Sequence, residues 1–61
     1  MDIYSAAMIA DGEWGLTDLE PSEENFLDAY RCLIRSGAAW QLPGRIGRTA
    51  MGLIRQGLIE G

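Results

Sequence analysis

The sequence lacks the residues that most often cross-link or activate a small protein. It has no histidine, no lysine and no valine, and Cys32 is its only cysteine. These absences exclude an internal disulfide and a Cys/His zinc site, and they leave Cys32 without a histidine to activate it as a catalytic thiol. We therefore expect Cys32 to be a small, partly buried apolar residue, and we expect no metal and no cofactor.

Long apolar runs are missing as well. No stretch approaches the ~20 consecutive apolar residues that are needed to span a bilayer. The N-terminal segment carries Asp2 but no basic residue, which is unlike a secretory signal. A single cysteine suits a reducing compartment. The sequence thus predicts a cytoplasmic protein that does not act at a membrane.

The length of 61 residues predicts a single domain over residues 1–61. A chain this short buries only about 60% of the surface that its unfolded form exposes. Because disulfides and zinc are excluded, stability must come from close helix packing or from self-association. The hydrophobic content of 48% is enough for either, so a homo-oligomer is one expectation.

Apolar periodicity predicts an all-α fold, a small three-helix domain. The first helix is expected over residues 3–11, the second over residues 23–36, and the third from residue 44 or 45 onward. A short connector that contains Trp40 joins the second and third helices. Strands are not expected, because nothing alternates with a period of two residues and valine is absent.

Local signals mark where these helices begin and end. Asp2 and Ser22 are residue types that favour the N-cap position, where a side-chain oxygen accepts a hydrogen bond from the first turn. Gly37 predicts a left-handed helix stop, and the Pro43-Gly44 dipeptide predicts a turn before the third helix.

Helical wheels separate the apolar from the polar positions of each helix. In the first helix, the core face is expected to hold Ile3, Ala6, Ala7, Ala10 and Trp14. Outside that face fall the apolar residues Tyr4, Met8 and Ile9. In the second helix, the core face is expected to hold Phe26, Leu27, Tyr30, Leu33 and Ile34. In the third helix, the core face is expected to hold Ile46, Ala50, Leu53, Ile54 and Leu58.

The opposite side of the third helix carries an arginine stripe. It consists of Arg45, Arg48 and Arg55, with Gly52 among them, and we expect it to face solvent as the candidate partner-binding site. Glycine costs about 1 kcal/mol relative to alanine inside a helix. Gly52 is therefore either merely tolerated or retained because another backbone approaches it closely.

Trp40 and Gln41 are the other candidate site residues. Trp40 is expected to plug the core between the helices, and the alternative is an exposed hot spot, for which tryptophan and arginine are favoured residue types. Gln41 is expected to satisfy buried backbone groups beside it.

Charge is distributed unevenly along the chain. Residues 1–30 contain eight acidic residues and no basic one, whereas residues 31–61 contain five arginines and a single acid, Glu60. Two interpretations remain open, and the first of them is favoured. Either the acidic half folds onto the basic half, or the molecule has a bipolar surface that meets partners.

Several blocks of the sequence resemble a family of short, uncharacterised proteins found in bacteriophages and in prophage regions of bacterial genomes. That family's pattern contains I-Y-x-A-A-x-I-x-x-G, then L-I-x-x-G, W-Q-L-x-G-x-x-G-R-T-A and a second L-I-x-x-G. The matching residues are Ile3, Tyr4, Ala6, Ala7, Ile9, Gly12, Leu33, Ile34, Gly37, Trp40, Gln41, Leu42, Gly44, Gly47, Arg48, Thr49, Ala50, Leu53, Ile54 and Gly57. Pro43 and Arg45 stand at variable positions of the pattern. The resemblance implies a small phage-type accessory protein in a bacterial host cytoplasm.

Two classes of function follow from these observations. The favoured one is a non-enzymatic protein that binds a host or phage protein, or itself. Binding is expected through the arginine stripe on the outer face of the third helix and through the exposed parts of the first helix, and modulation or inhibition of a host protein is one form of it. The alternative is a helix-turn-helix-like nucleic-acid binder that uses the same stripe. The long connector and the net charge of −4 weigh against the alternative. An enzyme is not expected, because three short helices leave little room for a shaped cleft.

Overall fold

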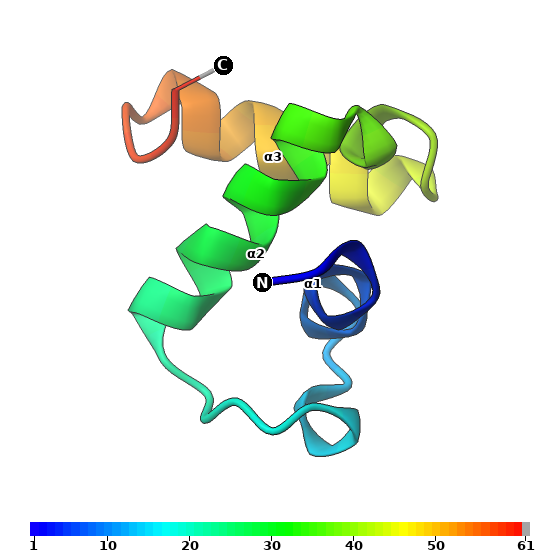
Figure 1. The fold of residues 1–61 in the computed structure, drawn as a ribbon. Coiled ribbons are helices and arrows are strands. Elements are labelled where there is room, and N and C mark those ends of the chain that lie inside the picture. Colours follow the sequence, from blue (N-terminus) through cyan, green and yellow to red (C-terminus); the bar gives the residue numbers. More distant parts are fainter. Residues whose placement is uncertain (61) are drawn as a thin grey trace.

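The computed structural model describes residues 1–60 of the chain. It contains the helices α1 (Ile3–Ala10), α2 (Glu23–Ser36) and α3 (Gly44–Arg55), and the short 3₁₀ turns η1 (Trp14–Leu16) and η2 (Ala38–Trp40). No strand occurs within residues 1–60, so the predicted all-α, three-helix fold is confirmed. Figure 1 shows α2 running through the middle, with α3 across its C-terminal end and α1 beside it. The segment that contains η1 lies at the end opposite α3.

The helix ends form where the local signals predict them. The Asp2 carboxylate accepts a hydrogen bond from the Ser5 backbone N–H at 3.0 Å, and the Ser22 hydroxyl accepts one from the Asn25 N–H at 3.1 Å. Gly37 ends α2 in the left-handed conformation, with a φ of 83°. These features depend on neighbouring residues alone, which is why the sequence predicts them.

The core lies where α1, α2, η2 and α3 meet. Its fully buried members with large side chains are Ile9, Tyr30 and Leu33. The whole buried cluster consists of Ala6, Ile9, Ala29, Tyr30, Leu33, Ala39, Ile46, Ala50 and Ile59. The four alanines in it are completely buried, and their small side chains let the helices approach one another closely.

Two predicted core positions are wrong in α1. Ile9 was expected outside the core face but is buried, with 2% of its surface exposed, whereas Ile3 was expected in the core and is 38% exposed. The helix has only eight residues, about two turns, and it is apolar nearly all round. The path of α2 therefore selects the buried side, which passes through Ala6 and Ile9.

One predicted core position is wrong at the other end of the chain. Leu58 was expected on the core face of the third helix, but α3 ends at Arg55 and Leu58 is 42% exposed. Gly57 has a positive φ of 76° and redirects the backbone, so Ile59 is the residue that reaches the core. The helical period that placed Leu58 does not continue past this glycine.

Candidate functional site

A close approach between η2 and α3 forms the base of the candidate site. A Cβ atom placed on Gly47 would lie 3.4 Å from the carbonyl oxygen of Ala39 and 4.0 Å from Cε3 of Trp40. Both are ordinary van der Waals distances, so the connector packs closely against α3 at Gly47. Ala39 fills the space between the helices and is completely buried.

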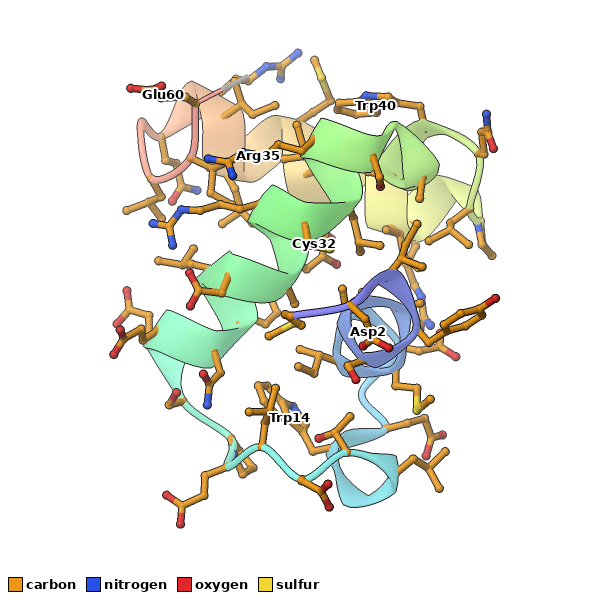
Figure 2. All side chains as sticks on the ribbon, in the orientation of Figure 1. Asp2, Trp14, Cys32, Arg35, Trp40 and Glu60 are labelled. Carbon is orange, nitrogen blue, oxygen red and sulfur yellow. The ribbon has the colours of Figure 1, made fainter. Side chains whose placement is uncertain are left out.

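Trp40 does not plug the core. Its side chain is 49% exposed, because the neighbouring Ala39 occupies the interior position of η2. Figure 2 shows Trp40 at the end of the molecule formed by α3, far from Trp14 at the opposite end. The expectation of a core tryptophan is therefore wrong. Trp40 is instead exposed, as its alternative role as an exposed hot spot requires.

An open groove runs along α3 beside Trp40. It encloses about 680 Å³ and is lined by Trp40, Gly44, Gly47, Arg48, Met51, Gly52 and Arg55. We call it the α3 groove. Its glycines expose backbone instead of side chains, while Trp40 and Met51, which is 43% exposed, form an apolar strip. The groove thus offers a flat apolar contact between two arginines.

The arginines of the predicted stripe do not all belong to the groove. Arg45 forms an ion pair with Asp11, the residue that follows α1, and it is absent from the groove lining. Among residues 1–60, neither Arg48 nor Arg55 has a carboxylate oxygen within 4.0 Å. These two cations are seven residues apart, which is about 10 Å along a helix. They give the groove a positive charge that the described part of the chain does not neutralise.

One protein-family model matches a part of the chain that includes every residue lining this groove. The family described as "Domain of unknown function (DUF7417)" matches residues 13–61, about four-fifths of the chain. The chain belongs to this family. The DUF7417 match contains η1, α2, η2 and α3, whereas α1 precedes it. Comparisons with curated proteins and with solved structures give no match.

Within the DUF7417 region, the structure brings together four of the six predicted site residues. The groove unites Trp40, Arg48, Gly52 and Arg55. Gln41 is exposed, and none of the hydrogen bonds within residues 1–60 involves its side chain, so its expected role in satisfying buried backbone groups is wrong.

Sequence reasoning missed Met51 as a member of this site. Met51 follows Arg48 by three residues and precedes Arg55 by four, so a helical wheel places all three on one face. The helical period therefore predicts Met51 on the arginine face, although an apolar residue between two cations was not expected there.

The interface behind the groove contains a buried tyrosine. Tyr30 of α2 is 2% exposed, and burial raises the pKa of its hydroxyl above the ordinary value of 10.0, while the Thr49 side chain and the positive charge of Arg45 act in the opposite direction. No buried side-chain nitrogen or oxygen within the described residues lacks a hydrogen-bond partner. Tyr30 is therefore a neutral group at physiological pH.

The α3 groove is lined by apolar and cationic side chains. Its side chains are an indole, a thioether and two guanidinium groups, and arginine stays charged at any physiological pH. Over residues 1–60, no group of three or more acidic, cysteine or histidine side chains is placed to hold a metal ion. None of the helices in that range is both long enough and apolar enough to cross a membrane.

Proposed function

We propose that the chain is a small, non-enzymatic accessory protein that acts by binding another protein through the α3 groove. The observation that carries this proposal is a half-exposed tryptophan beside two arginines without carboxylate partners in residues 1–60. Tryptophan and arginine dominate the binding energy of protein interfaces, and methionine is enriched in them. The groove combines all three residue types.

The setting of this interaction is part of the proposal. The W-Q-L-x-G-x-x-G-R-T-A block resembles phage and prophage proteins, and it contributes Trp40, Gly44, Gly47 and Arg48 to the groove. We therefore place the protein in a bacterial host cytoplasm, with a host or phage protein as its partner. Modulation or inhibition of that partner is the mode of action that we propose.

Nucleic-acid binding is the second candidate, because Arg48 and Arg55 are exposed on one helix that follows another. Three observations weaken it. Arg45 is paired with Asp11, the connector between α2 and α3 has seven residues, and the net charge is −4. Helix-turn-helix units join their helices through a turn of about 3–4 residues, and affinity for phosphates requires net positive surface.

Capture from a bacterial host lysate separates the two candidates. The tagged protein is incubated with lysate that has or has not been treated with nuclease, and the retained protein is identified by mass spectrometry. We expect a stoichiometric protein partner that survives nuclease treatment. Recovery of nucleic acid, with loss of the retained proteins on digestion and a steep loss with added salt, would replace our proposal with the nucleic-acid one.

A further inference from the structure

We propose that the α3 groove accepts the acidic end of a second copy of this chain, so that copies associate head to tail. This inference rests on the proposed function in one respect, since it takes the groove to be a protein-binding surface. It adds the chemistry of the occupant, which is an apolar side chain surrounded by carboxylates.

The acidic end is formed by Glu13, η1, the loop after it and the first turn of α2. Its carboxylates belong to Glu13, Asp18, Glu20, Glu23 and Glu24, all of which are exposed. None of these five forms an ion pair within the part of the chain that the structure describes. Leu16 lies among them in sequence, and its side chain is 69% exposed.

The two surfaces are complementary in charge and in polarity. The groove holds two arginines without carboxylate partners in residues 1–60, whereas the acidic end holds five carboxylates without cationic partners there. Each surface also exposes apolar side chains, Trp40 and Met51 in the groove and Leu16 at the acidic end. Burial of Leu16 against Trp40 removes apolar surface from water while the charges pair at the rim.

The fold prevents one molecule from making this contact with itself. The segment that contains η1 and the loop before α2 lies at the opposite end of the molecule from α3 (Figure 1). Among residues 1–60, the one ion pair that links the acidic half to α3 is Asp11–Arg45, and it lies outside both surfaces. Both surfaces therefore remain available to other molecules.

The contact is heterologous, because different patches of the two copies meet. When two copies meet, one of them keeps a free groove and the other keeps a free acidic end, so association continues into chains or closes into a ring. A standard interface takes about 800 Å² from each partner, and roughly one-fifth of the 4084 Å² surface of this molecule provides that area. Two such contacts fit on one copy. The net charge of −4 opposes assembly, so we expect weak association.

Sedimentation equilibrium with charge-reversed variants tests the inference. The groove variant carries Arg48→Glu and Arg55→Glu, and the end variant carries Asp18→Arg and Glu20→Arg. Asp18 and Glu20 are suitable because both lie in the exposed loop, outside the first turn of α2. Arg35→Glu is the control, since Arg35 is exposed, lies on α2 and does not line the groove. Circular dichroism verifies that each variant is folded.

We expect the wild-type protein and the Arg35→Glu control to associate with increasing concentration. Each reversed variant alone should associate at least tenfold more weakly, because the groove variant meets the five carboxylates with two carboxylates of its own, and the end variant presents only three carboxylates beside two arginines to the basic groove. An equimolar mixture of the two variants should regain association, since the unchanged groove of the end variant meets the unchanged acidic end of the groove variant. A merely structural role of these residues does not produce such a rescue.

Several results would overturn the inference. The wild type could stay monomeric up to about 1 mM, or the mixture could fail to associate. A dimer that the groove variant breaks and the end variant leaves intact would show that grooves pair with grooves. If self-association fails while Arg48→Glu and Arg55→Glu still abolish capture of a lysate protein, the inference is wrong and the proposed function stands. If the groove variant changes neither measurement, both are wrong.

Discussion

Two glycines show how the same residue type has opposite energetic roles in this chain. Gly52 lies within α3, and a Cβ atom there would meet no other atom within 4 Å, whereas Gly37 has a φ of 83°. We expect Gly52→Ala to raise the free energy of unfolding by about 1 kcal/mol, because alanine is the better helix former. Gly37→Ala should lower it, since a side chain is strained at positive φ.

Urea denaturation measures both glycine variants, and capture from lysate then separates the two interpretations of Gly52. Full partner binding by the more stable Gly52→Ala variant would show that the glycine is merely tolerated. Loss of binding despite higher stability would show that a partner's backbone needs the space. Gly37→Ala is the matched control for the stability measurement. An equal gain in the free energy of unfolding at both positions would contradict the explanation of Gly52→Ala by helix propensity.

The buried Tyr30 makes stability depend on alkaline pH. Burial raises its pKa above 10.0 in the folded state, so as the pH rises past 10 the unfolded chain loses this proton first. Stability is therefore fully present below pH 10 and falls as the pH rises through the folded-state value. We expect Tyr30→Phe to flatten the decline of urea midpoints above about pH 10. Tyr4→Phe, at a side chain that is 73% exposed, is the control, and an equal effect there would contradict the assignment.

Trp40 illustrates what residue identity leaves open. Tryptophan is highly buried on average, yet here the adjacent Ala39 fills the interior and Trp40 lies on the surface. The deciding contact is the approach of the connector to Gly47 of α3. That approach is a property of the folded chain, so composition and local spacing did not predict the exposure of Trp40.

At the scale of elements, one ion pair ties the end of α1 to the start of α3. The Arg45 and Asp11 side chains are 61% and 53% exposed, so solvent screens their attraction. A double-mutant cycle with Asp11→Asn and Arg45→Gln should give a coupling energy below about 1 kcal/mol, and added salt should reduce it. A coupling of several kcal/mol, independent of salt, would show that this pair holds α1 in place. We expect the buried Ala6 and Ile9 to do that instead.

Elements were predictable to the extent that their signals are local. The caps at Asp2 and Ser22 and the stop at Gly37 each depend on a few neighbouring residues, and all three form as predicted. The buried side of α1 depends on the path of α2, which lies many residues away, and it was predicted wrongly at Ile3 and Ile9.

At the scale of the whole molecule, the sequence showed an uneven charge distribution but not whether its halves meet. The structure links the acidic half to α3 through Asp11–Arg45, while the pair of Asp28 and Arg31, at 2.6 Å, lies within α2. The segment that contains η1, the loop after it and the start of α2 lies at the end of the molecule opposite α3, as Figure 1 shows, and this segment carries most of the acidic residues of the first half of the chain. The surface is thus bipolar, and this arrangement underlies both the proposed function and the head-to-tail contact.

The most direct measurement of the central claim is the yield of protein captured from nuclease-treated lysate by three tagged baits. They are the wild type, Arg55→Glu and Arg35→Glu. Arg55 and Arg35 occupy the last turns of α3 and α2, so the two substitutions change charge and helix stability alike, but only Arg55 lines the groove. We predict that Arg35→Glu retains the wild-type yield and that Arg55→Glu loses it about tenfold. Equal yields from the two variants would contradict the account, because the α3 groove would then not be the binding surface.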